Sequence, residues 1–373
     1  MKRSVTLSVE ALDPQLTGVG RYVWELARRL PTQAGIGKIR FLRNGEWFPD
    51  PARLLVDPSP KKRPKHIRWL RKRAKPLLRL RDEWLARSSI CHGPNFFLPD
   101  IAEKGVITVH DLSVFRYPET HPAARREHFD RDFARTLERA SHIITVSEAI
   151  RQEVMDFTGF SVDKVTTVYQ GVGSAFQPRD ADMLTPPLAP YGLTPGGYAL
   201  CVSTIEPRKR IGELLQAWRR LPVAVRARWP LVLAGSSGWL SEDILRDMAQ
   251  AEREGWLHYV RYVPEQDLPL LYAGAALFVY PSVYEGFGLP PIEAMASGIP
   301  TVVADASCLP EVTGGAGMLV QPEDVDAFAR HLEQALTDAQ WRAQAREAGL
   351  VVAGGYSWDR CVKETVDVYR RLD

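Results

Sequence analysis

The chain has 373 residues, which at about 100–200 residues per domain predicts two domains. Hydrophobic residues make up 45% and charged residues 25%, and this excludes the disordered and fibrous classes of protein. The four cysteines lie far apart and fit no metal-binding spacing, so we expect buried thiols in a reducing compartment. We recognise no signal peptide and no apolar run of about 18 residues, and therefore expect a cytoplasmic location.

The first half of the chain alternates β-branched runs with helical patterns. We expect strands at residues 4–9, 106–109, 143–146 and 164–169. Between the first two strands, residues 61–81 hold eleven Lys and Arg and no Asp or Glu, although the formal net charge of the whole chain is only +3. Apolar residues at helical spacing accompany these cations. Three interpretations of the segment are open. It is a surface helix that docks on anionic lipid, a patch that binds nucleic acid, or a solvated helix face.

A segment rich in Pro, Gly and Asp, residues 173–197, predicts a linker. After it we expect strands at 198–202, 231–234, 259–263, 276–280 and 301–303, again with helical patterns between them. Repeated β–α units predict an α/β fold with two Rossmann-like, doubly wound parallel sheets that face each other across a cleft. The expected domains are residues 1–180 and 195–356, and helix 357–373 is a candidate to pack back on the first domain.

The strongest chemical signal lies in residues 280–298. Glu285 follows a buried strand, and Gly286-Phe287-Gly288, two prolines and a helix containing Glu293 come next. Prolines suit the first turn of a helix, where the free backbone N–H groups can bind hydroxyls or an anion. The two glutamates can then reach different parts of one polar ligand. The alternative is a capped strand–helix junction with two solvated glutamates.

Other motifs bear on cofactors and metals. Gly18 and Gly20 follow the first strand, but the third glycine and the downstream acidic residue of a dinucleotide site are absent, so NAD is not expected. Asp-x-Asp occurs at residues 130–132, 180–182 and 324–326 and never directly after a strand, so we expect no metal. The cations of Arg208 and Lys209 can stabilise a developing negative charge instead. His110 ends a buried strand at the edge where such sheets bind ligands.

The Glu-x7-Glu pattern in EGFGLPPIEAMASGIPTVV closely resembles the retaining nucleotide-sugar glycosyltransferases of family four, which have the two-Rossmann GT-B fold. The segments VPEQDLPLLYAGAALFVYPS, CLPEV and GAGMLVQPED are similar to the same family. In the first half, TGVGRYVWELARRL, TVHDL, TVSEAIRQEV and VYQGV match more loosely. STIEPRKR together with VHDL is most similar to bacterial mannosyltransferases of polysaccharide assembly.

The resemblance implies a role for each matching residue. Glu285 is expected to contact the donor sugar hydroxyls, Glu293 to hold the ribose and His110 to face the transferred sugar. The glycine loop of Gly18 and Gly20 is expected to let the backbone approach the diphosphate. Further donor-binding groups are expected at the backbone amides of Phe287, Gly288 and Leu289.

The chain departs from the family at one motif. Ser203 and Thr204 stand where the family usually has a glycine and an arginine, whereas Lys209 stands at the expected lysine position. The neighbouring Arg208 is therefore a candidate for the missing cation. Both residues are expected to take part in catalysis.

Together these inferences predict a retaining, metal-independent glycosyltransferase without a cofactor. We expect it to transfer mannose from GDP-mannose to a growing glycan, linked to a lipid diphosphate, in bacterial polysaccharide synthesis. The alternatives are a UDP-sugar donor of the glucose type, a nucleotide-sugar 2-epimerase and a non-catalytic binding protein. A lipid-linked acceptor favours the membrane interpretation of Lys61–Arg81, with peripheral association at the inner face of the membrane and no nucleic-acid partner.

Overall fold

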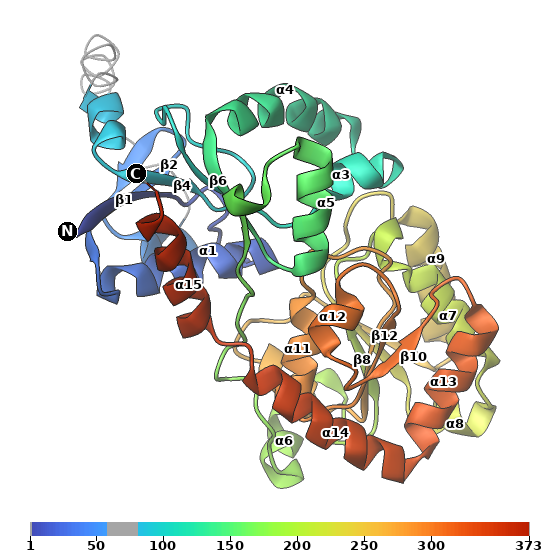
Figure 1. Cartoon of the computed structure of the whole chain (residues 1–373). Helices are drawn as coiled ribbons and strands as arrows, with labels where there is room; N and C mark the ends of the chain where they lie inside the picture. Colours follow the sequence, from blue (N-terminus) through green and yellow to red (C-terminus); the bar gives the residue numbers. More distant parts are fainter. Residues whose placement is uncertain (1, 58–80, 373) are drawn as a thin grey trace, which may run out of the picture.

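The computed structural model describes residues 2–57 and 81–372 and contains two α/β domains (Figure 1). In the N-terminal domain the described residues form a seven-stranded sheet of order β3-β2-β1-β4-β5-β6-β7, parallel except for β3. Its strands are β1 (Arg3–Ser8), β2 (Ile36–Arg43), β3 (Glu46–Phe48), β4 (Ile90–Gly93), β5 (Gly105–Val109), β6 (Ala140–Thr145) and β7 (Val165–Thr167). Its helices are α1 (Gly18–Arg29), α3 (Ser113–Arg116), α4 (Ala123–Arg139) and α5 (Glu148–Thr158).

The C-terminal domain has a parallel six-stranded sheet of order β10-β9-β8-β11-β12-β13. The strands are β8 (Ala199–Val202), β9 (Leu231–Ala234), β10 (Leu257–Arg261), β11 (Leu277–Tyr280), β12 (Thr301–Ala304) and β13 (Met318–Val320). The helices are α6 (Ala181–Leu188), α7 (Ile211–Arg220), α8 (Val223–Arg228), α9 (Glu242–Arg253), α10 (Leu268–Ala273), α11 (Leu289–Ala296), α12 (Leu309–Thr313), α13 (Val325–Thr337) and α14 (Ala339–Gly354). The predicted fold class of two doubly wound parallel sheets is confirmed.

Some elements differ from the sequence-based prediction. The segment 173–197 is not an irregular linker throughout, because α6 forms within it and buries Leu184 and Leu188. The strand predicted at 259–263 begins two residues earlier, as β10. Strands β2, β3, β4 and β13 were not predicted.

The last helix, α15 (Trp358–Arg370), leaves the C-terminal domain and lies beside α1 (Figure 1). Its buried residues Cys361 and Val362 belong to the same apolar cluster as Tyr22 and Leu26 of α1. The Tyr369 hydroxyl lies 2.7 Å from Nδ1 of His92 in β4. The end of the chain therefore completes the core of the N-terminal domain.

Candidate active site

The two domains touch at backbone level where β5 and β11 end. His110 follows β5, and Gly286 lies in the loop after β11. A Cβ atom on Gly286 would lie 1.8 Å from the carbonyl oxygen of His110, so only glycine permits this contact. Ser147 Oγ donates to the carbonyl oxygen of Gly286 over 2.7 Å, again from one domain to the other. The loop that carries Glu285 is thus held against the N-terminal domain.

Glu285 lies at the centre of a buried cluster of charges. Its Oε1 accepts hydrogen bonds from Lys209 Nζ and, over 2.8 Å, from the Tyr280 hydroxyl. Arg208 Nη1 lies 3.8 Å from Oε2. Burial raises the pKa of Glu285, but Lys209 and Arg208 outweigh burial and hold this pKa below its usual range. Glu285 is therefore ionised and able to accept hydrogen bonds from sugar hydroxyls.

Arg208 and Lys209 lie in a short turn, Pro207–Lys209, that follows β8. Arg208 also donates to the carbonyl oxygen of Tyr284 and to Glu206, whose Oε1 lies 2.8 Å from Nη2. Burial lowers the pKa of Arg208, but the nearby carboxylates, Glu285 above all, raise it by more than burial lowers it. The net pKa is above the usual value, so the guanidinium stays charged. Its Nε is buried and has no hydrogen-bond partner within the described residues. Two cations are thus available beside Glu285 for a developing negative charge.

Helix α11 presents its amino end beside this cluster. Gly288 precedes the helix with φ of +88°, a conformation that favours glycine, and Pro290 and Pro291 fill the first turn. Within the described part of the chain no hydrogen bond uses the backbone N–H groups of Phe287, Gly288 or Leu289. The side chains of Phe287 and Leu289 are buried. The free amides form a site for an anion or hydroxyl groups.

The amino end of α1 lies next to that of α11. A Cβ atom on Gly18 would lie 3.7 Å from Cδ1 of Leu289, so Gly18 lies at the interface between the domains. Gly20 lies deeper, because a Cβ atom there would approach the carbonyl oxygen of Ala11 to 2.9 Å. The Gly20 N–H donates to Oγ1 of Thr17, the N-cap of α1, over 3.2 Å. Of the two predicted glycines, Gly18 lies closer to α11.

Glu293, in α11, has a different environment from Glu285. It is 5% exposed, and its nearest cation is Arg21 of α1, whose Nη1 lies 3.9 Å from Oε1. Arg21 also forms an ion pair of 3.3 Å with Glu265. Burial raises the pKa of Glu293 above its usual range, because the opposing effect of Arg21 is smaller. Glu293 is a buried carboxylate whose charge is only partly compensated.

His110 is buried and neutral. Its Nε2 lies 2.9 Å from the carbonyl oxygen of Pro94, to which it donates, and the side chain of Gln170 lies 3.4 Å from Nδ1. Its ring meets Tyr22 edge to face at 5.0 Å. Burial lowers the pKa of His110 below its usual range. The predicted sugar-facing histidine is thus fixed in one tautomer beside Gly286.

Sequence reasoning missed several members of the site. Tyr280 binds Glu285, and Arg21 reaches Glu293 from the other domain. Ser307 has φ of +54°, and its Oγ donates to the carbonyl oxygen of Glu285 over 2.7 Å. The position of Tyr280, five residues before Glu285, was an available signal, whereas Ser307 lies 22 residues after Glu285. Nothing in the sequence pairs Arg21 with Glu293.

The three Asp-x-Asp segments lie on separate elements away from this cluster. Asp132 of α4 pairs with Arg131 and His128, Asp180 precedes α6, and Asp324 caps α13. Over residues 2–57 and 81–372, no group of three or more His, Cys, Asp and Glu is arranged to hold a metal ion.

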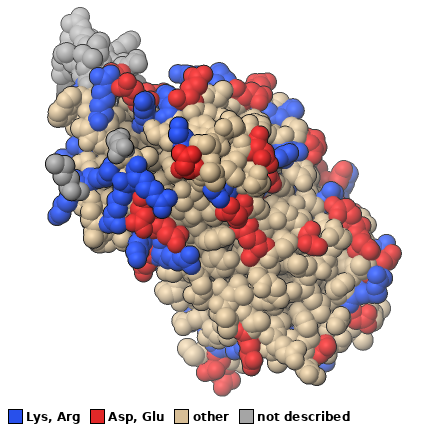
Figure 2. Space-filling view, in the orientation of Figure 1, with Lys and Arg blue, Asp and Glu red and all other residues tan. Residues whose placement is uncertain are grey.

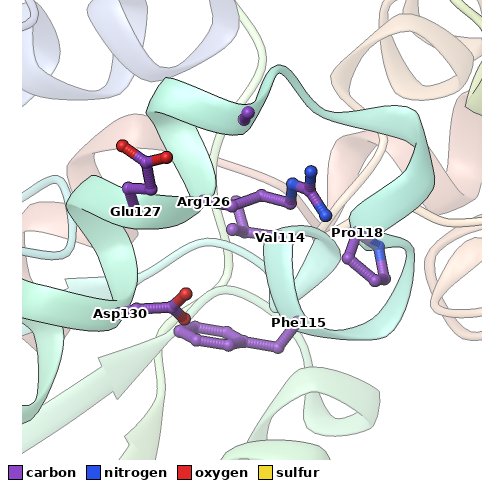
Figure 3. A pocket seen from close by; sticks show the side chains of 7 residues that line it. Val114, Phe115, Pro118, Arg126, Glu127 and Asp130 are labelled. Carbon is purple, nitrogen blue, oxygen red and sulfur yellow. The ribbon is translucent and has the colours of Figure 1, made fainter.

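A separate surface cavity of about 300 Å³ lies between α3 and α4 (Figure 3). Phe115 and Pro118 line it together with the charged side chains of Arg126, Glu127 and Asp130. It contains none of the predicted site residues, and we assign it no role in donor binding.

Two family models match the chain in succession. The Glycosyltransferase Family 4 model matches residues 16–175, and the model named Glycosyl transferases group 1 matches residues 194–351. With two Rossmann-like domains, the protein is a glycosyltransferase of the GT-B class. The chain belongs to glycosyltransferase family four, as the sequence motifs predicted.

A relative and two solved structures extend this finding. The O-antigen chain mannosyltransferase B of Escherichia coli is 40% identical over 380 residues, which cover 99% of this chain and 100% of the relative. WaaG, a glycosyltransferase involved in lipopolysaccharide biosynthesis, has a TM-score of 0.73 at 15% identity and covers 99% of this chain and 100% of its own. HepE of Anabaena, in complex with UDP and glucose, has a TM-score of 0.73 at 16% identity and the same coverage. The two structures support the fold.

Proposed function

We propose that the protein is a retaining mannosyltransferase that uses GDP-mannose and extends a lipid-linked glycan in bacterial polysaccharide assembly. Similarity along the whole chain to an O-antigen chain mannosyltransferase supports the choice of mannose and of the pathway class. The observation that carries the proposal is the cluster of Glu285, Lys209 and Arg208 beside the free amides of α11. It combines an acceptor for sugar hydroxyls with cations for a diphosphate.

In the proposed mechanism the bond between the sugar C1 and the diphosphate oxygen breaks, and the acceptor oxygen bonds to C1 on the same face. A donor phosphate oxygen takes the acceptor's proton, so no protein base is assigned. Lys209, Arg208 and the amino end of α11 stabilise the charge on the leaving GDP without a metal ion. Glu285 orients the sugar beside His110, and Glu293 binds the ribose.

The test is turnover of GDP-mannose and of UDP-glucose by the purified protein, with and without a mannan-type lipid-linked acceptor. We expect GDP release and mannosyl incorporation that depend on the acceptor and persist in EDTA. Transfer from UDP-glucose alone would favour the UDP-sugar alternative, and release of free sugar without acceptor would favour an epimerase. Inactivation by EDTA with recovery in Mg²⁺ would contradict the metal-independent mechanism.

We also propose that the protein docks on anionic membrane through Lys61–Arg81, a segment that, except for Arg81, lies outside the described residues. Residues 1–180 hold 31 Lys and Arg against 21 Asp and Glu. On the face in Figure 2, blue side chains gather over the N-terminal domain. Directly after the segment, Trp84 is 67% exposed. Among the described helices none is long and apolar enough to cross a membrane.

Liposome sedimentation tests this proposal. The protein should sediment with anionic liposomes, much less with neutral ones, and should be released by a several-fold increase in salt. Replacing Arg71, Lys72 and Arg73 with Gln should weaken binding by up to about 3 kcal/mol. Equal binding to neutral liposomes, or binding to neither, would contradict an electrostatic dock. Tight, salt-dependent binding of RNA would favour the nucleic-acid alternative.

A further inference from the structure

The first turn of α5, in the N-terminal domain, is held by a carboxylate from the C-terminal domain. Oε1 of Glu311, in α12, accepts the backbone N–H of Glu148 over 2.7 Å, and Oε2 accepts that of Ala149 over 2.9 Å. The hydroxyl of Tyr169, which follows β7, donates to Oε1 over 2.8 Å. All three donors belong to one domain and the acceptor to the other.

This contact completes the cap of α5. The first N–H groups of a helix have no acceptor within the helix, and its amino end favours negative charge. The side chain of the N-cap residue, Ser147, accepts the N–H of Ile150 over 3.3 Å. Glu311 satisfies two further amides with charge-assisted hydrogen bonds, which are stronger than neutral ones. If the domains separated, these amides and the carboxylate would lose their hydrogen bonds to each other and would be hydrated instead.

Residues next to this contact in both domains hold the loop that carries Glu285. Ser147 Oγ donates to the carbonyl oxygen of Gly286, next to Glu285. Ser307 and Cys308, which lead into α12, both donate to the carbonyl oxygen of Glu285, over 2.7 and 3.2 Å. The start of α5 therefore contacts the loop that carries Glu285 through Ser147. It also contacts α12, whose preceding residues hold this loop, through Glu311.

We propose that Glu311 is a positioning residue for glycosyl transfer, which holds the two domains closed over the donor by capping α5. Glu311 does not contact the donor. It favours the closed arrangement, in which the amino ends of α1 and α11 and the Glu285 loop come together. The donor then binds a preformed site and does not itself have to supply the free energy of closure.

The experiment compares Glu311→Gln with a control, Glu347→Gln, at an exposed position of α14. We expect Glu311→Gln to raise the KM for GDP-mannose about tenfold, to leave kcat at saturating donor within about twofold, and to accelerate hydrogen exchange at the Glu148 and Ala149 amides. Tyr169→Phe, which removes one of the three hydrogen bonds, should raise KM about twofold to threefold. The control should change neither quantity.

Hydrogen exchange does not depend on the identity of the donor, so it separates this proposal from the proposed function. Unchanged KM together with unchanged exchange at Glu148 and Ala149 in folded Glu311→Gln would overturn the positioning role. A lower kcat at unchanged KM would also overturn it, because that result indicates a general structural effect. If Glu311→Gln does not fold, an unchanged KM in Tyr169→Phe decides against the proposal.

Discussion

The carboxyl groups of Glu285 and Glu293 have different electrostatic environments, although they lie only eight residues apart. Both are buried, yet Glu285 has two cations within 4 Å, whereas among the described residues Glu293 has only Arg21, at 3.9 Å. The pKa of Glu285 is consequently lowered and that of Glu293 raised. Lys209 and Arg208 therefore outweigh burial at Glu285, whereas Arg21 does not outweigh burial at Glu293. Perturbation in opposite directions within one site is typical of functional groups.

Glu285→Gln should impair turnover more than nucleotide binding. In the proposed mechanism, the substitution removes the charge that orients the sugar hydroxyls but leaves the amides of α11 and the proposed ribose contact of Glu293 intact. We expect kcat to fall about tenfold or more, a loss of about 1.4 kcal/mol of transition-state stabilisation. Calorimetry should find the Kd for GDP within about threefold of wild type. An equal loss of GDP affinity and rate would show that Glu285 serves the nucleotide instead.

Glu293→Gln should have the reverse effect. A raised carboxyl pKa favours folding only below the usual pKa, and this contribution is lost as pH rises through the folded-state value. At neutral pH the neutral amide should therefore leave the melting temperature unchanged or raise it. GDP binding should weaken about tenfold through lost ribose contacts, roughly 1.4 kcal/mol. A melting temperature that falls with Glu293→Gln at pH 7 would contradict this sign.

Substitutions of Lys209 and Arg208 should differ in their effects, with Lys209 more important for catalysis and Arg208 more important for stability. Arg208 is held by Glu206, Glu285 and a backbone carbonyl. Its removal leaves buried Glu206 without the cation that it pairs with and Glu285 with one cation fewer, and breaking a buried ion pair typically costs about 3–5 kcal/mol. Among the carboxylates that the structure describes, Lys209 pairs with Glu285 alone, so its ammonium group is freer to turn toward a diphosphate. We expect Lys209→Ala to lose more kcat/KM and Arg208→Ala to lose more melting temperature. A reversed order in kcat/KM would make Arg208 the principal phosphate cation.

At the scale of elements, the sequence predicted the strands in which every residue is buried, which are β5, β9, β11 and β12. The run Val106–Val109 lies in β5, where every residue is buried. The missed β2 mixes exposed and buried residues without a regular alternation and lies next to the edge strand β3. The missed β4 has only four residues, which include His92 and Gly93. Glu285, Glu293 and the start of α11 were predictable because they lie within one continuous motif. Contacts from Arg21 and Ser147 depend on the approach of the domains, which no local pattern encodes.

Gly286→Ala tests the backbone contact between the domains. The new Cβ would lie 1.8 Å from the carbonyl oxygen of His110, and backbone on both sides leaves little room to adjust. We expect kcat/KM to fall at least about tenfold, with a larger radius of gyration in solution scattering. Gly212→Ala is the matched control: it lies in α7, and a Cβ there meets nothing within 4 Å. Wild-type kcat/KM in Gly286→Ala would show that the domains need not meet here.

At the scale of the whole molecule, the two ends of the chain lie in one core. Trp358, Cys361, Val362, Val366 and Tyr369 of α15 are buried in the cluster that contains β1 and α1. Each buried side chain of this size contributes about 1.5–3 kcal/mol. Five of them approach the net stability of a typical domain, about 5–15 kcal/mol. The N-terminal domain therefore depends on a helix that follows the C-terminal domain in the sequence.

A chain that ends at residue 355 should consequently contain a folded C-terminal domain and an unfolded N-terminal one. Without α15, the side chains of Tyr22 and Leu26 become exposed to water, and the imidazole of His92 loses its hydrogen bond with Tyr369. We expect rapid proteolysis within residues 2–170, while residues 198–340 stay protected. A synthetic peptide of residues 356–373 should restore protection when added in excess, because it binds only the folded domain. The same peptide with Val362 and Val366 replaced by Asp should not. Protection of the N-terminal half in the shortened chain would show that its core is stable without α15.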